Sequence, residues 1–360
     1  DVTVNETRVL MRVLRDMNTS KLVDEDGILF NELLNDLFPN ESIEDDTYVD
    51  LQRGIAKSVK DRRLIDHPDW NRKIVELYEQ YKVRHGLCIM GPSGAGKSSC
   101  IRVLADALSQ VEPVPTKIMK MNPKAITANQ MFGILDPSNN DWVDGIFSAL
   151  WKGVMRGEQE GKKEHSWILL DGPVDAVWIE NLNTVLDDTK SLTLASGDRL
   201  GMPKTLKLVL EVGNLDNASP ATVSRVGMVY IGENSLGWKP CFQAWLFKYE
   251  MKDRLKTVLE RLFEAHIDPI LNFITLHCEK KMPLTDSNLL INTLKLLDGL
   301  FFSYPNIANM SEKAIERIFI FGLIWGVGGV IGFEDRQKLH QYMQAERRLE
   351  IPAVDSVDTV

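Results

Sequence analysis

The sequence predicts an α/β domain built on a five-stranded parallel sheet, followed by an all-α domain. Short apolar runs with the length of buried strands recur at residues 87–90, 117–121, 167–170, 206–212 and 228–231. Helix-length segments separate these runs, which is typical of a parallel sheet flanked by helices. Later in the chain helical periodicity takes over, at residues 242–274, 287–302, 311–325 and 334–348. We therefore expect an α/β domain at 49–236, a helical domain at 237–350 and a tail at 351–360.

Helices are also predicted ahead of the sheet. Apolar residues fall on one helical face at 9–14 and again at 29–38, before Pro39 ends the pattern. The acidic stretch at 41–46 marks a boundary, so residues 1–48 are expected to form a separate helical segment. A further amphipathic helix, at 66–85, leads into the first strand of the sheet.

A short hairpin is predicted between two strands of the sheet. Residues 191–194 and 199–202 have strand-like composition and flank a turn at 195–198 that contains Gly197. Such a turn between two short strands indicates an insertion that projects from the domain.

Composition and charge limit the class of protein. The chain has 360 residues, of which 44% are hydrophobic and 26% charged, which is typical of a folded protein with two or three domains. The longest apolar stretch, 318–331, is interrupted by glycines and predicts a buried helix ending in a glycine turn, so we expect no membrane insertion. A net charge of -9 argues against a large nucleic-acid surface. The basic cluster at 57–63 leaves open a local contact with phosphate or protein, or a solvated surface.

The cysteines and the start of the chain suggest where the protein works. The four cysteines, Cys88, Cys100, Cys241 and Cys278, have no metal-like spacing, and Cys88 lies in an apolar strand. Reduced packing cysteines in a cytoplasmic protein are therefore expected. The chain begins at Asp1 without an apolar leader, which fits a piece of a larger polypeptide.

A glycine-rich loop joins the strand at 87–90 to an amphipathic helix. The loop is Gly91, Pro92, Ser93, Gly94, Ala95, Gly96, Lys97 and Ser98, and Ser99 begins the helical stretch. Glycines let backbone N–H groups turn toward phosphates, and the helix that follows adds its positive end. Lys97 would reach the β- and γ-phosphates of ATP, or the β-phosphate of ADP, and the Ser98 hydroxyl would bind Mg²⁺. An accidental glycine turn with this pattern is expected in roughly one chain per hundred of this length, and the strand and helix context makes it rarer.

An aspartate ends the apolar run at 167–170, as expected for a residue that orders Mg²⁺. Asp171 would lie at the carboxyl edge of the sheet, beside the phosphates. The next residue is Gly172, which has no side chain to orient or deprotonate an attacking water. Loss of such a base typically costs 10²- to 10⁴-fold in rate. Asp175 could replace it, although a role as an acid in the first turn of the next helix also explains it.

Two further polar residues follow strands of the sheet. Asn214 comes after the run at 206–212 and could contact the γ-phosphate or water, or could be an ordinary turn residue. Arg225 stands just before the last strand, where its guanidinium could reach a phosphate held by a neighbouring module. An exposed arginine paired with a carboxylate is the alternative for Arg225.

These features together resemble an AAA+ module with its helical lid, and longer stretches are similar to one family of such proteins. They are MNPKA at 121–125, DWVDG at 141–145, DGPVDAVWIENLNTVLDD at 171–188 and ASPATVSR at 218–225. They resemble the second AAA+ module of a dynein heavy chain, somewhat closer to axonemal than to cytoplasmic dyneins. Residues 1–48 resemble the helical end of the preceding module's lid.

The resemblance implies a module that binds ATP with little or no turnover. The main hydrolytic site would then lie between the preceding module and this one, with Arg225 as the arginine finger for the neighbour's ATP. Neighbouring AAA+ modules would be partners, and the hairpin at 191–202 would face the mechanical linker, unless it is a simple solvent hairpin. Microtubules would be bound only through a stalk that this sequence lacks. The resemblance also implies a location in the cytoskeleton, in a ciliary or flagellar axoneme.

Two other functions stay open from the sequence. One is an autonomous P-loop ATPase that uses Asp175 or another carboxylate as its base. The other is a structural scaffold in which the phosphate loop no longer binds nucleotide.

Overall fold

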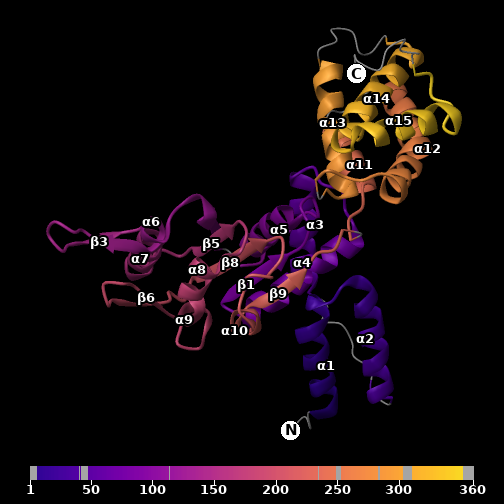
Figure 1. Cartoon of the computed structure of the whole chain (residues 1–360). Coiled ribbons are helices and arrows are strands. Elements are labelled where there is room, and N and C mark those ends of the chain that lie inside the picture. Colours follow the sequence, from indigo (N-terminus) through magenta and orange to yellow (C-terminus); the bar gives the residue numbers. More distant parts are fainter. Residues whose placement is uncertain are drawn as a thin grey trace. The chain divides into compact units, whose positions relative to one another are not determined.

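The computed structural model describes residues 6–39, 41, 48–112, 114–233, 235–248, 253–282, 284–302 and 310–351. It divides into two compact units, one formed by residues 1–62 and 66–236 and the other by residues 63–65 and 237–360. The first unit holds the sheet and the second is helical (Figure 1).

The first unit is built on a parallel sheet of five strands in the order β2-β5-β8-β1-β9. The strands are β1 (Gly86–Met90), β2 (Thr116–Met121), β5 (His165–Asp171), β8 (Leu206–Val212) and β9 (Gly227–Tyr230). The central strands β1, β5 and β8 are buried nearly throughout, whereas the edge strand β2 is only partly buried. The predicted five-stranded parallel sheet is confirmed.

Side chains on β8 alternate between the two faces of the sheet, as a strand period of two requires. Leu206, Leu208, Leu210 and Val212 join a core with Trp151 and other residues of the helices after β2. Those helices are α6 (Ala128–Phe132), α7 (Ile146–Gln159), α8 (Ala176–Ile179) and α9 (Asn183–Leu186). Glu211 therefore points to the opposite face.

That opposite face carries three helices that pack against one another. They are α3 (Val49–Asp61), α4 (Pro68–Val83) and α5 (Lys97–Val111). Helix α4 buries Ile74 and Leu77 completely. Helix α3 was not predicted: the basic cluster at 57–63 masked its apolar residues Leu51, Ile55 and Val59, which are buried.

Two short hairpins extend from the unit (Figure 1). The predicted one pairs β6 (Ser191–Thr193) with β7 (Arg199–Gly201), and its turn contains Gly197 at φ 90°. A second hairpin, β3 (Gly133–Leu135) with β4 (Trp142–Asp144), was missed because each strand has only three residues. A three-residue strand is too short to show an alternating pattern.

The first helices of the chain expose their apolar residues. α1 (Glu6–Asn18) and α2 (Asp24–Leu37) bear out the predicted helices, linked by the short helix η1 (Thr19–Lys21). Their exposed side chains include Val9, Leu10, Val13, Ile28, Leu29, Leu33 and Leu37, at 45–63% exposure. An amphipathic helix that exposes such a face has no core of its own to bury it. The predicted boundary at 41–46 lies almost wholly outside the described residues.

A cavity of about 810 Å³ lies between these two helices and helices α3 and α4. Its wall includes Asp16 of α1 and Glu79 of α4. The pKa of Glu79 is raised from 4.5 to about 7, mainly by burial and then by the carboxylates of Asp16 and Glu76, which Arg15 partly opposes.

The raised pKa of Glu79 predicts a pH-dependent stability. Between about pH 4.5 and pH 7 the folded chain keeps a proton on Glu79 that the unfolded chain has lost, so stability falls as the pH rises through this range. We expect Glu79→Gln to raise the melting temperature at pH 8 by roughly 2–4 °C, since the partly exposed group is screened, and to raise it less at pH 5. Glu25→Gln on the exposed surface of α2 serves as the control. An equal shift at both pH values would contradict a titrating Glu79.

The second unit is a bundle of helices, as predicted. It contains α11 (Lys239–Lys248), α12 (Asp253–His277), α13 (Asp286–Phe302), α14 (Glu312–Gly326) and α15 (Phe333–Ala345), around one apolar core. The helix expected at 242–274 is two helices, and the residues between them are not described. α14 ends in a glycine turn, η5 (Gly328–Val330), as expected. No helix among the described residues is long and apolar enough to span a bilayer. Of the predicted tail, only Ile351 is described.

Candidate functional site

The phosphate loop follows β1 and leads directly into α5. Its geometry requires glycine at both ends: a Cβ at Gly91 would come within 2.1 Å of the Ile231 carbonyl oxygen, and a Cβ at Gly96 within 2.7 Å of the Trp70 indole nitrogen. Gly96 also has a left-handed backbone, at φ 89°, where it caps α5. The loop therefore brings backbone N–H groups to the N-terminus of a 15-residue helix, an arrangement that attracts phosphate.

Lys97 lies folded over this loop. Its Nζ atom donates to the carbonyl oxygens of Gly91 at 2.6 Å and Pro92 at 2.7 Å. Burial lowers the pKa of Lys97, while the negative charges of Glu211 and Asp171 oppose that change. A partly desolvated ammonium group held at the loop is well placed to bind phosphate oxygens.

Ser98, the predicted magnesium ligand, contacts a carboxylate that the sequence analysis did not single out. Its hydroxyl donates to Oε1 of Glu211, on strand β8. Glu211 is only 6% exposed, and it pairs in register with Ile89 of β1 on one side and Asp171 of β5 on the other. Residues in register on parallel strands share a face, so Glu211 and Asp171 both point toward the side of the sheet that carries α5.

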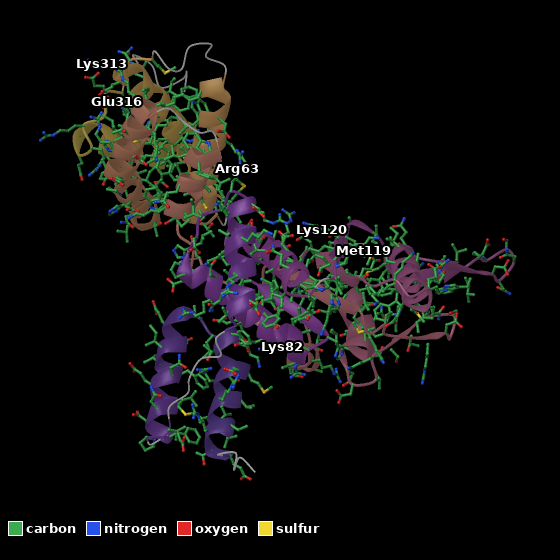
Figure 2. All side chains as sticks on the ribbon, turned by 180° about the vertical axis from the view of Figure 1, so that it is seen from behind. Arg63, Lys82, Met119, Lys120, Lys313 and Glu316 are labelled. Carbon is green, nitrogen blue, oxygen red and sulfur yellow. The ribbon has the colours of Figure 1, made fainter. Side chains whose placement is uncertain are left out.

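Asp171 ends β5 at the carboxyl edge of the sheet, as predicted. Its Oδ2 atom is 2.5 Å from Nζ of Lys120, which lies on the edge strand β2 (Figure 2). Both side chains are partly exposed, at 36% and 45%. Asp171 is therefore partly accessible at the carboxyl edge of the sheet.

Ser98, Asp171 and Glu211 fit a magnesium ion. Mg²⁺ takes oxygen ligands, usually one or two carboxylates together with phosphate oxygens and several waters. Within the described parts of the chain, no three His, Cys, Asp or Glu side chains gather into a metal site of their own. Any Mg²⁺ at the loop would thus depend on phosphate oxygens for part of its coordination.

The residue after Asp171 is a glycine that lies close to the side chain of Asn122. A Cβ at Gly172 would lie 2.6 Å from Oδ1 of Asn122. Asn122 is held in place because this same oxygen accepts a hydrogen bond from the Lys124 backbone N–H at 2.9 Å, which caps the short helix η2 (Pro123–Ala125). The sequence therefore has no carboxylate directly after Asp171, and a larger residue there would require Asn122 to move.

Asp175 is occupied by structural contacts. It caps α8 by accepting the Val177 N–H at 3.0 Å, and it forms an ion pair with Lys124. The hydrogen bond from Lys124, followed by the one from Val177, lowers its pKa. A carboxylate with a lowered pKa is a poor general base at neutral pH.

Arg225 lies at the end of the sheet opposite to the phosphate loop. It ends α10 (Pro220–Arg225), two residues before Gly227, which pairs with Leu87 near the start of β1. Gly91 lies four positions further along the chain than Leu87, a distance of about 13 Å in an extended strand. The guanidinium contacts Asp187 at 3.2 Å and is 31% exposed. Arg225 is therefore remote from the chain's own phosphate loop.

The remaining candidates lie at the loop or beside it. Ser93 is exposed, and Ser99 is partly buried in the first turn of α5. Asn214 lies in an exposed position two residues after β8. The strand places Asn214 at the same edge of the sheet as Gly91, since Val212 pairs with Met90.

Family models match successive parts of the chain. The model described as "Hydrolytic ATP binding site of dynein motor region" matches residues 1–98, "AAA domain (dynein-related subfamily)" matches 86–226, and "Dynein heavy chain AAA lid domain" matches 259–360.

Curated relatives are similar over nearly the whole chain. The human dynein axonemal heavy chain 8 is 46% identical over 351 residues, covering 97% of this chain. The rat dynein axonemal heavy chain 5 is 43% identical over 95% of the chain, and the dynein gamma chain of the flagellar outer arm of Chlamydomonas reinhardtii is 42% identical over 99%. The chain belongs to the dynein heavy chain family. It spans only 8%, 10% and 8% of the length of these three relatives.

Membership of the dynein family agrees with the AAA+ fold, since the dynein-related AAA model covers four of the five strands of the sheet and the dynein lid model covers most of the helical unit. Sequence reasoning missed two residues of the site, Glu211 and Asn122. A charged residue inside the apolar run 206–212 was the available signal for Glu211, because a glutamate in a buried strand needs a partner. Asn122 was visible only as the residue after a predicted strand.

Proposed function

We propose that this chain is the second AAA+ module of an axonemal dynein ring, and that it holds Mg-ATP with little or no hydrolysis. The observation that carries the proposal is Gly172, whose missing side chain leaves no carboxylate at the position directly after Asp171. Lys97, Ser98 and Asp171 supply the phosphate and magnesium contacts that binding needs. The site thus has the groups for binding and lacks the usual group for water activation.

The position in the ring is supported by the start of the chain. The exposed apolar residues of α1 and α2 need a partner, and if residues 1–48 are the helical end of the preceding module's lid, the rest of that lid would supply it. The family model described as a hydrolytic ATP site matches residues 1–98 and ends before Asp171 and Gly172. On this proposal residues 49–236 and 237–350 are the large and small parts of the module itself.

Arg225 would act on the neighbouring module's ATP. Its place at the far edge of the sheet removes it from the chain's own loop, and Asp187 holds it in a partly exposed position. A permanently charged, planar guanidinium in such a position can stabilise charge on a phosphate bound by another module.

The location and motor activity of the whole heavy chain are inferred from the relatives alone. Their names place them in the axoneme and in a flagellar outer arm, and we infer the same cytoskeletal location for this chain, in a motor that moves on microtubules. The linker contact of hairpin 191–202 belongs to this inference, and the microtubule contact would be made by other parts of such a motor.

An autonomous ATPase that uses Asp175 is the alternative, and turnover distinguishes the two. We expect the 360-residue chain to hydrolyse Mg-ATP well below about 1 s⁻¹, the low end of ordinary enzyme rates. Asp175→Asn should leave this slow rate unchanged, because Asp175 is committed to Lys124 and to the cap of α8. Hydrolysis above about 1 s⁻¹ that disappears in Asp175→Asn would favour the alternative.

A further inference from the structure

Glu211 is a buried carboxylate with one oxygen engaged and one oxygen free. Oε1 accepts the Ser98 hydroxyl, whereas Oε2 is shielded from solvent and has no hydrogen-bond partner among the described residues. An unsatisfied buried acceptor typically costs about 1–3 kcal/mol, and more when it is charged. Such an atom beside a phosphate loop indicates a place for a donor that arrives with the ligand.

The hydrogen bond between Ser98 and Glu211 leaves the serine free to bind a metal. A hydroxyl that donates its hydrogen keeps both oxygen lone pairs, and one of these can bind Mg²⁺. Metal binding withdraws electron density from the hydroxyl and makes it a better donor, so the bond to Glu211 and the bond to the metal support each other. Carboxylates that hold metal ligands in this way commonly affect metal affinity.

The strand register places Glu211 beside the predicted magnesium aspartate. Glu211 and Asp171 are paired residues on neighbouring strands, which lie about 4.8 Å apart. Both negative charges act on Lys97. Since Mg²⁺ bound to a nucleotide usually keeps several waters, a metal-bound water is the donor that the free Oε2 of Glu211 lacks.

We propose that Glu211 is a carboxylate of the magnesium site that contacts the ligands of the metal and not the metal itself. It orients the Ser98 hydroxyl through Oε1, accepts a hydrogen bond from a metal-bound water through Oε2, and thereby makes ATP binding strongly dependent on Mg²⁺. The inference rests on the proposed nucleotide-holding function. It assigns Glu211 a positioning role, whereas the proposed function depends on Lys97 and on Gly172.

The test measures ATP affinity of the full 360-residue chain with Mg²⁺ and with EDTA. Glu211→Gln keeps the shape of the side chain and removes the charge. We expect it to reduce the ratio of the affinity with Mg²⁺ to the affinity in EDTA by about 10- to 100-fold, the loss that mutation of such supporting groups typically causes at metal sites. The affinity in EDTA should stay unchanged. Glu180→Gln, at an exposed glutamate, is the matched control and should keep the ratio. Ser98→Ala should give a similar loss, and adding Glu211→Gln to it should cost little more, because both act on one metal ligand.

Each outcome decides the inference. The role of Glu211 would be overturned if Glu211→Gln left the ratio of ATP affinities with Mg²⁺ and with EDTA unchanged. It would also be overturned if the losses from Ser98→Ala and Glu211→Gln simply added. Either result would leave the nucleotide-holding function intact. Loss of slow hydrolysis without any change in that ratio would also overturn the role of Glu211, in favour of a base. If Glu211→Gln does not fold, Glu211→Asp and Ser98→Ala supply the same comparison. Failure of the unmodified chain to bind ATP under either condition would overturn the proposed function and this inference together.

Discussion

Replacing Lys97 by alanine is expected to weaken ATP binding by roughly 100-fold. Charge-assisted hydrogen bonds to phosphate contribute about 1.5–3 kcal/mol each, and every 1.4 kcal/mol corresponds to a tenfold change in affinity. In the structure Nζ of Lys97 donates to the carbonyl oxygens of Gly91 and Pro92, so its loss removes two hydrogen bonds from the free protein. Titration of Lys97→Ala with ATP in the presence of Mg²⁺ measures the effect.

The matched control for Lys97 is Lys57→Ala, at an exposed position on α3. It should bind ATP like the unmodified chain, and thermal melting should show that both variants are folded. Unchanged affinity in a folded Lys97→Ala protein would mean that the loop is vestigial, and the chain would then be a structural scaffold.

Replacing Arg225 by alanine is expected to slow ATP hydrolysis in the complete motor while leaving ATP binding at this chain's own loop nearly unchanged. An arginine finger is typically worth 10³- to 10⁵-fold in rate, and Arg225 lies at the sheet edge opposite to the loop. The measurement is the steady-state ATPase rate of a heavy chain that contains the preceding module, together with ATP binding by the 360-residue chain.

Arg225→Lys gives a sharper comparison, because lysine keeps the charge and loses the planar donor fork. It should recover only part of the lost rate. Asp187→Asn removes the contact that holds Arg225, and a smaller loss is expected there because the guanidinium itself remains. A motor ATPase rate that Arg225→Ala does not change would remove the arginine-finger assignment.

Local patterns were sufficient to predict the sheet and the phosphate loop. The apolar strands are continuous because both faces of a parallel sheet are covered, and the loop has a fixed spacing of glycines before Lys97 and Ser98. The helices of the second unit followed from the 3.6-residue period. In each case the information lies within a short stretch of chain.

Features that depend on contacts between distant residues could not be predicted in this way. Glu211 contacts Ser98 across 113 positions of sequence, and Asn122, which follows β2, lies close to Gly172. The exposed apolar faces of α1 and α2 look like ordinary core-forming faces in the sequence, because periodicity shows which residues share a face and does not show what covers that face. Helix α3 was not predicted because charged residues surround its buried apolar residues Leu51, Ile55 and Val59 in the sequence.

Extraction of the nucleotide bound at this site shows most directly whether the site holds ATP or cleaves it. The 360-residue chain would be loaded with Mg-ATP, separated from free nucleotide, kept for many minutes and then denatured, and the released nucleotide identified by chromatography. Lys97→Ala, treated in parallel, would show how much nucleotide is carried over or cleaved by contaminants. We expect the unmodified chain to release mainly ATP. Release of mainly ADP, at a level absent from the Lys97→Ala control, would contradict this expectation.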